Sequence, residues 1–316
     1  MIMKKSYPDV GIAKLCELFG KTRHAWYDNQ WRQHDDFLKV EIIIQEVIKI
    51  RILQPKIGTR KLQYKLEPIL LEHRMHIGRD HLFNILGEYK LLIRNRRRKA
   101  ITTDSRHWMH KYDNLIANMK IDRPEQVWVS DITFIRLTNG FLYLSLITDA
   151  YSRKIVGYNL SKNLLAVGCL SALEMALSNR MYKSSALIHH SDRGSQYCCK
   201  QYVQMLCDNK IEISMTQNGD PYENAIAERV NGIIKSEFNL YSSQCAFQET
   251  AVLVGQAITT YNDLRPHASC DYLTPNEAHK MNGMLKKRWK NYNKSSFTNP
   301  LILETKSRNF ETNQPV

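Results

Sequence analysis

The chain contains 316 residues, 43% of them hydrophobic, which is enough for two or more domains with buried cores. Its formal net charge of +14 predicts a polyanionic partner such as DNA. No apolar run of about 18 residues and no signal-peptide core occurs, so the composition excludes a membrane-spanning protein and predicts a cytoplasmic one, nucleoid-associated in a bacterium. The seven scattered cysteines predict free thiols rather than a disulfide framework.

The positive charge is concentrated in the first third of the chain. Residues 1–126 contain 25 Lys and Arg residues against 15 Asp and Glu residues, a net charge of +10 out of +14. Because neutralised phosphates release counterions, such a region supplies most nonspecific affinity for DNA. We therefore expect the N-terminal third to hold DNA. Residues 281–316 are expected to form a basic C-terminal tail, which either adds DNA contacts or is disordered.

The first of two predicted helical units covers residues 1–36. An apolar helix from Ile12 is followed by a break at Gly20 and by a second helix that Thr22 caps. This order is typical of helix-turn-helix motifs.

The second unit, residues 37–100, is predicted to be a helix-turn-helix DNA-binding domain. One helix follows Val40, another begins at Thr59, and residues 77–86 form a candidate recognition helix. A basic run comes next, for which a solvated linker or arm is the alternative to DNA contact. The expected DNA-binding residues of this unit are Arg60, Lys61, Arg79, Arg94, Arg96, Arg97, Arg98 and Lys99.

Residues 101–125 are polar and aperiodic, which predicts a linker, and residues 126–280 are predicted to form an α/β core. Asp131 stands among β-branched and aromatic residues typical of a strand, and the turn before Gly140 predicts a hairpin. A third strand, a helix and a short fourth strand precede Asp192. This acid is therefore expected at the carboxyl end of a strand, where open α/β sheets place their ligand sites.

Glu228 is predicted on a helix whose polar and apolar faces oppose each other. At about 100° per residue, Glu228, Asn231 and Lys235 fall within about 60° of one another. The apolar side chains between Ile226 and Ile234 spread over the opposite side. Glu228 and Lys235 are therefore expected to face one cleft, where Asn231 and Lys235 contact DNA.

Taken singly, these acids have ordinary explanations, such as a solvent-facing strand residue or an exposed helix charge. Asp149 follows the neighbouring strand, but Ser152 and the basic residues after it favour a turn-capping role. Structural zinc is disfavoured, because no Cys-x-x-Cys pair occurs in the chain. The rival third acids are Asp220, Glu223 and Glu237.

Asp131, Asp192 and Glu228 are separated by 60 and 35 residues. Carboxylates are the ligands that Mg²⁺ prefers, and two such ions activate an attacking oxygen and stabilise a leaving one at a phosphodiester. The spacing resembles the DDE signature of transposases and integrases. More closely, residues 126–278 resemble the catalytic core of bacterial insertion-sequence transposases of family three. The matching motifs are Asp131-Ile132-Thr133, the runs from Asp149 to Gly157 and from His189 to Tyr197, Asn224-Ala225 before Glu228, Tyr261-Asn262, Arg265-Pro266-His267 and Thr274-Pro275.

The resemblance implies an RNase H-like fold in which Asp131, Asp192 and Glu228 hold two Mg²⁺ ions, for which Mn²⁺ substitutes. It implies cleavage at the element ends and strand transfer of the released 3′-OH, with Lys235 matching a basic residue that assists DNA binding. It also implies a homo-oligomer on terminal-repeat and target DNA and, for many members, fusion by frameshifting to a short upstream partner.

Two other functions share part of this pattern. A noncatalytic DNA-binding regulator derived from a transposase would keep the helical units and lose acids, but all three acids are present. A nuclease of the RNase H type without strand transfer would share the metal site, but it does not account for the two DNA-binding units. We therefore expect a DNA transposase.

Overall fold

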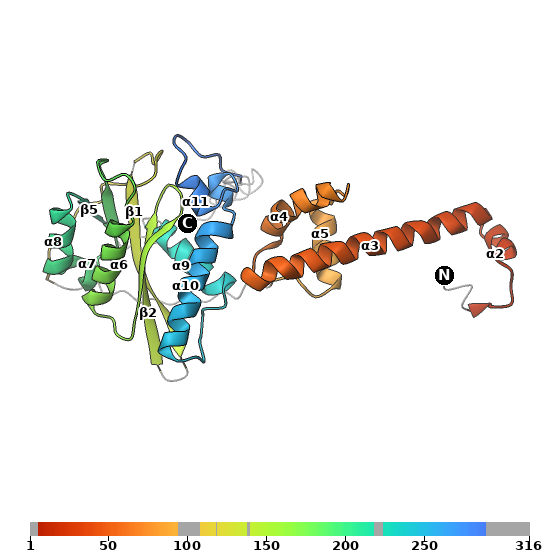
Figure 1. Cartoon of the computed structure of the whole chain (residues 1–316), viewed down its shortest axis with the longest axis horizontal. Helices are drawn as coiled ribbons and strands as arrows, with labels where there is room; N and C mark the ends of the chain where they lie inside the picture. The colour runs from red at the N-terminus through yellow and green to blue at the C-terminus, as the bar shows by residue number, and fades with distance from the viewer. Residues whose placement is uncertain (1–5, 94–107, 118, 138–139, 218–223, 289–316) are drawn as a thin grey trace, which may run out of the picture.

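The computed structural model of the chain has two lobes joined side by side (Figure 1). It describes residues 6–93, 108–117, 119–137, 140–217 and 224–288. The helical lobe comprises residues 6–93, and the core comprises the described residues from 108 to 288. Within these residues, no helix combines the length and the apolar character needed to cross a membrane.

The helical lobe begins with α2 (Ile12–Leu18) and the long α3 (Arg23–Leu53). The expected cap is present, since the Thr22 hydroxyl accepts a hydrogen bond from the Ala25 amide at 3.1 Å. The expected boundary between residues 36 and 37 falls inside α3, because no Gly or Pro interrupts this stretch of sequence. One helix therefore connects the two predicted helical units.

Two further helices, α4 (Thr59–Glu72) and α5 (Arg79–Glu88), pack against the second half of α3. The α5 helix corresponds to the candidate recognition helix. Its apolar side chains join those of α3 and α4 in one core, built from Ile43, Ile44, Val47, Ile57, Leu62, Leu66, Leu70, Ile77, Leu82, Ile85 and Leu86. The lobe therefore has a hydrophobic core of its own.

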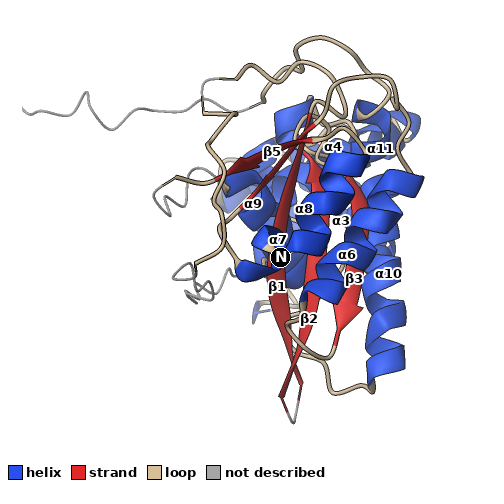
Figure 2. Ribbon diagram, turned by 90° about the vertical axis from the view of Figure 1, so that its left-hand side faces the viewer, coloured by secondary structure: helices blue, strands red, loops and turns tan. Residues whose placement is uncertain are grey.

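The core is built on a five-stranded sheet with the order β3-β2-β1-β4-β5. Strands β1, β2 and β3 form an antiparallel meander, and β4 and β5 continue the sheet in parallel with β1. The hairpin of β1 and β2 extends beyond the other strands at one end (Figure 2). The strands are β1 (Val127–Leu137), β2 (Gly140–Asp149), β3 (Ile155–Ser161), β4 (Ile188–Ser191) and β5 (Glu212–Met215).

Helices cover both faces of the sheet. On one face lie α6 (Ala166–Ser178), α7 (Ser195–Cys198) and α8 (Lys200–Asp208). On the other lie α9 (Ala225–Glu237) and α10 (Phe247–Leu264). Gly157 allows α6 to approach β3, because a Cβ atom there would lie 2.1 Å from the Ala172 carbonyl oxygen. This arrangement confirms the expected RNase H-like α/β core.

Segments at both ends of the core complete its packing. Part of the expected linker lies against the sheet, where the Asp113 carbonyl accepts a hydrogen bond from the Met215 amide at 3.2 Å. Beyond α10, the 3-10 helix η1 (Ala268–Cys270) leads to α11 (Pro275–Ala278), which begins with a complete Thr274 capping box. Residues 289–316 of the expected tail lie outside the described residues.

Candidate active site

The parallel pairing of β1 and β4 places the two aspartates on adjacent strands. Ser130 lies opposite Ser191 in the sheet register, so Asp131 and Asp192 each follow one member of this pair. Asp192 comes directly after the last residue of β4, as expected. Two acids that are 61 positions apart in sequence are therefore neighbours where β4 ends beside β1.

Asp131 accepts two hydrogen bonds, and its surroundings raise its pKa. Its Oδ2 accepts a hydrogen bond from Asn231 Nδ2 at 2.7 Å, and its Oδ1 accepts one from the Ile132 amide at 2.8 Å. Burial raises the pKa of Asp131 to about 7, with repulsion from Asp192 as the second cause and a weaker contribution from Glu228. The site therefore concentrates negative charge that a cation would relieve.

The loop after β4 wraps around Asp192. Asp192 Oδ1 accepts a hydrogen bond from the Gly194 amide at 3.0 Å. A Cβ atom at position 194 would lie 3.0 Å from this same oxygen, so a glycine lets the backbone approach the carboxylate closely. The loop thereby fixes the orientation of Asp192 before α7 begins.

Helix α9 presents the third acid as the helical projection predicted. Val230, Ile233 and Ile234 are buried against the sheet, whereas Glu228 is exposed. Its carboxylate is nevertheless partly desolvated by the surrounding protein, which raises the pKa of Glu228. Glu228 is therefore on the face of α9 that is not packed into the hydrophobic core.

Two asparagines fasten α9 to β1. Asn224 Nδ2 donates a hydrogen bond to the Ser130 carbonyl oxygen at 3.1 Å, and Asn231 bonds Asp131 two helical turns further on. Asn231 was expected to contact DNA, but its side chain is buried and oriented toward Asp131. Its role in this structure is to position the first acid.

Lys235 lies in the last turn of the same helix. Its Nζ is 5.1 Å from the centroid of the Phe134 ring and 5.9 Å from that of Tyr241. Burial lowers the pKa of Lys235, and the nearby Asp131 opposes this shift. The ammonium group is therefore held by aromatic rings beside the acids rather than by a carboxylate ion pair.

The donor set suits a hard divalent cation. Asp131 and Asp192 offer carboxylate oxygens, which are the ligands that Mg²⁺ prefers. Among the described residues, no three acidic, histidine or cysteine side chains are gathered tightly enough to hold an ion as they stand. The fit thus rests on the placement of Asp131 and Asp192 on adjacent strands, with Glu228 on the exposed face of α9.

A buried polar cluster supports β1 and β4 behind the aspartates. His189 Nε2 lies 2.6 Å from Ser130 Oγ and 2.9 Å from the Tyr202 hydroxyl. Burial lowers the pKa of His189 to about 3, so the imidazole is neutral, and its Nε2 lies within hydrogen-bond distance of both hydroxyls. The sequence pattern contained no signal for this cluster, because its members come from three separate elements.

The structure assigns Asp149 a capping role, as predicted. Asp149 Oδ1 accepts hydrogen bonds from the Ser152 amide at 2.7 Å and the Ser152 hydroxyl at 2.6 Å. Its Oδ2 accepts one from the Glu125 amide at 2.7 Å. His279 lies between the two buried carboxylates, with Nε2 3.4 Å from Glu125 and Nδ1 3.6 Å from Asp149. The sequence analysis did not identify Glu125 or His279.

The expected DNA-binding residues of the helical lobe are in three different situations. Arg60 and Arg79 are exposed, and Arg79 pairs with the neighbouring Asp80 at 2.8 Å. Lys61 is turned toward the core, where its Nζ lies 3.3 Å from Glu237 Oε1. Five residues of the basic run lie outside the described residues, namely Arg94, Arg96, Arg97, Arg98 and Lys99.

Two family models, both described as an integrase core domain, match residues 121–221 and 209–275. The first match contains Asp131 and Asp192, and the second contains Glu228. An uncharacterized 31 kDa protein of insertion element IS600 from Shigella sonnei is 32% identical over 83% of this chain and 96% of its own length. The transposase for insertion sequence element IS629 from Shigella sonnei is 29% identical, covering 88% and 95% of the two chains. Transposase InsF for insertion sequence IS3A from Escherichia coli strain K12 is 24% identical, covering 88% and 96%.

Proposed function

This chain belongs to the integrase-core DDE transposases of the IS3 family of insertion sequences, and we propose that Asp131, Asp192 and Glu228 carry its chemistry. The protein is a DNA transposase and polynucleotidyl transferase. In the proposed reaction, it hydrolyses a phosphodiester at each element end, and the released 3′-OH attacks a second phosphodiester. One strand bond breaks and one forms in the joining step, so no external energy source is required.

The proposed metal ligands are three carboxylates of this chain. Asp131, Asp192 and Glu228 are proposed to hold two Mg²⁺ ions, or Mn²⁺ in their place. Bound metal supplies activation of the attacking oxygen and charge stabilisation of the leaving oxygen. The observation that supports this most strongly is the register of β1 and β4, which places Asp131 and Asp192 on adjacent strands, with Glu228 on the exposed face of α9.

DNA is the proposed partner of both lobes. The helical lobe is proposed to hold the terminal repeats through exposed basic residues, and the core to hold the scissile strand. We further propose a homo-oligomer on DNA, because two element ends and a target must be brought together, and an upstream DNA-binding protein as an additional partner.

The test uses labelled DNA carrying the ends of the element that encodes the chain. In Mg²⁺, we expect purified protein to release a 3′-OH at the ends and to join them to a second strand. In EDTA, neither product should form, while end-binding persists. Binding without cleavage at every Mg²⁺ and Mn²⁺ concentration would instead support a noncatalytic regulator.

The exposed arginines of the helical lobe give a prediction about salt dependence. Arg60→Ala and Arg79→Ala should each reduce the steepness of the plot of log binding constant against log salt concentration by about 1, because each is proposed to neutralise one phosphate. Lys49→Ala is the control, since this exposed lysine of α3 is not among the proposed DNA contacts. An unchanged slope for both arginine variants would exclude the surface around Arg60 and Arg79 as the DNA-binding surface.

A second prediction separates the two faces of α9. Lys235→Ala should weaken the complex with a DNA end by about 1–2 kcal/mol, the range for a charge-assisted hydrogen bond to phosphate. Its Mg²⁺ affinity should stay unchanged, because Lys235 is not a proposed metal ligand. Ile233→Lys should instead unfold the core, since it places an unpaired charge in the hydrophobic cluster. DNA titrations and thermal melts of both variants decide the assignment.

A further inference from the structure

The C-terminal end of α9 carries an ion pair network that the catalytic chemistry does not use. Glu237, the last residue of α9, receives two hydrogen bonds of 2.7 Å from Arg265, which is only 1% exposed. Arg265 also lies 2.8 Å from His267 Nε2. Because the guanidinium and carboxylate already satisfy each other, Glu237 does not need a further cation.

Lys61 nevertheless reaches into this network from the helical lobe. It comes from the first turn of α4 and lies 3.3 Å from Glu237 Oε1. Burial lowers the pKa of Lys61 to about 8, with the positive charge of Arg265 as the second cause. An exposed phosphate-binding lysine would not be desolvated in this way. Lys61 is therefore a contact between the lobes.

The surrounding contacts join the same two surfaces. The Lys56 amide donates to the Glu237 carbonyl at 3.0 Å, and the side chains of Gln54 and Lys65 both donate to the Leu264 carbonyl at 3.0 Å. These bonds occupy the backbone carbonyls where α9 and α10 end. The helical lobe is thus attached to the helix that carries Glu228 and to its neighbour.

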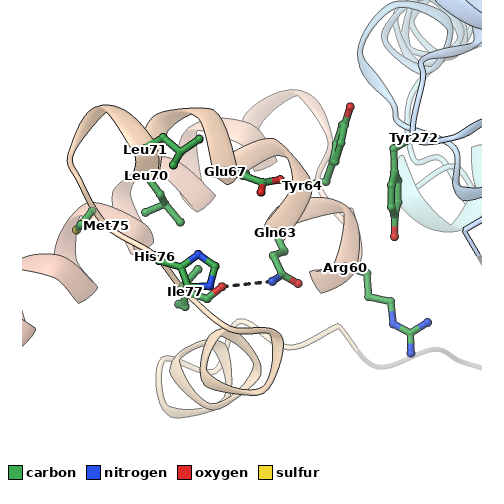
Figure 3. Close-up of a pocket in the computed structure, with 10 residues that line it drawn as sticks. All are labelled: Arg60, Gln63, Tyr64, Glu67, Leu70, Leu71, Met75, His76, Ile77 and Tyr272. Carbon is green, nitrogen blue, oxygen red and sulfur yellow. Dashed lines mark hydrogen bonds between the residues drawn. The ribbon is translucent and has the colours of Figure 1, made fainter.

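An aromatic stack completes this junction. Tyr64 of α4 stacks on Tyr272 of the core with ring centroids 4.8 Å apart and planes 20° from parallel. Figure 3 shows the two rings facing each other, and both rings and Arg60 line a pocket of about 190 Å³. Both aromatic and charged contacts therefore hold α4 in one orientation on the core.

We propose that Lys61 is a positioning residue: through Glu237 it fastens the helical lobe to the catalytic helix α9, so that DNA held by this lobe is presented to the acids of the same chain. This inference rests on the proposed function. It assigns Lys61 to the alignment of DNA with the acids, whereas its neighbour Arg60 remains available to contact phosphate.

The first test separates alignment from binding. Lys61→Met keeps the length of the side chain and leaves Glu237 paired with Arg265, so we expect a melting temperature close to that of the wild type. End-binding should stay within about twofold, while single-turnover cleavage should fall about tenfold, and Lys61→Arg should recover most of the rate. Lys49→Met, on the exposed surface of α3, is the matched control and should retain full cleavage. Cleavage by Lys61→Met at the wild-type rate would overturn the proposal. Weaker DNA binding, with a less steep dependence of the log binding constant on log salt concentration, would also overturn it, because Lys61 would then be a phosphate contact.

Hydrogen exchange tests the junction without relying on activity. In Lys61→Met, the Lys56 amide and the last turn of α9 should exchange faster than in the wild type. Unchanged exchange would overturn the proposal even if cleavage fell. A wild-type protein that fails to cleave would refute the proposed function instead, and the exchange result would still decide whether Lys61 fastens the lobes.

Mixing variants tests whether the alignment acts within one chain. Protein with Lys61→Met has intact acids, and protein with Asp131→Asn has an intact junction. If one chain must contain both features, the mixture will cleave no faster than Lys61→Met alone. Recovery of the wild-type rate in the mixture would overturn alignment within the same chain.

Discussion

Asp131→Asn will reduce cleavage and strand transfer at least about 1000-fold, which corresponds to roughly 4 kcal/mol of barrier. Asp192→Asn and Glu228→Gln are expected to have effects of the same order. End-binding should stay within about twofold, because these acids are proposed to hold metal and not to grip DNA. Gel-shift and cleavage assays on the same preparations measure the two quantities separately.

Mg²⁺ binding provides an independent measurement on the same variants. Metal that binds only the folded protein raises its melting temperature, so Mg²⁺ should stabilise the wild type and not Asp131→Asn. Asp208→Asn, an exposed carboxylate on α8, serves as the control and should respond like the wild type. Near-normal cleavage by any of the three acid variants would remove that residue from the site.

The parts of the site that the sequence could predict depend on local patterns. Asp192 follows a short strand bounded by polar residues, and Glu228 lies opposite a run of apolar residues at helical spacing. The structure confirms both placements, because strand ends and helix faces are determined by residues close in sequence. The family resemblance then supplied the order of the three acids.

The remaining parts depend on packing between distant segments. The projection placed Asn231 on the same face as Glu228, but its partner Asp131 is 100 residues away. Lys61 and Glu237 are 176 residues apart, so the sequence does not reveal their contact. Lys61 was therefore predicted to bind DNA, as a basic residue in a helix-turn-helix pattern. Lys61 joins the lobes only because the end of α9 lies against α4, and no local pattern encodes that contact.

A large predicted effect on stability concerns the buried side chain of His279. This side chain is 1% exposed and lies between the buried carboxylates of Glu125 and Asp149. His279→Ala should destabilise the core by about 3 kcal/mol, because it removes the side chain that two buried carboxylates share, although Arg180 remains 3.8 Å from Glu125. For a domain of this size, the melting temperature should fall by roughly 6–12 °C. Thermal melts of His279→Ala and of the exposed control His73→Ala measure the difference.

The pH dependence of this loss distinguishes charge from packing. Burial opposes protonation of His279, but hydrogen bonds to Asp149 and Glu125 outweigh it and raise the pKa above 6.5, despite the nearby positive charge of Lys154. The folded protein therefore binds more protons than the unfolded protein between pH 6.5 and the raised pKa, so the stabilisation is complete below this window and is lost as the pH rises through it. The deficit of His279→Ala should accordingly be larger at pH 6 than at pH 9. Equal deficits at both pH values would show that His279 acts through packing and neutral hydrogen bonds, without the charge that the two carboxylates favour.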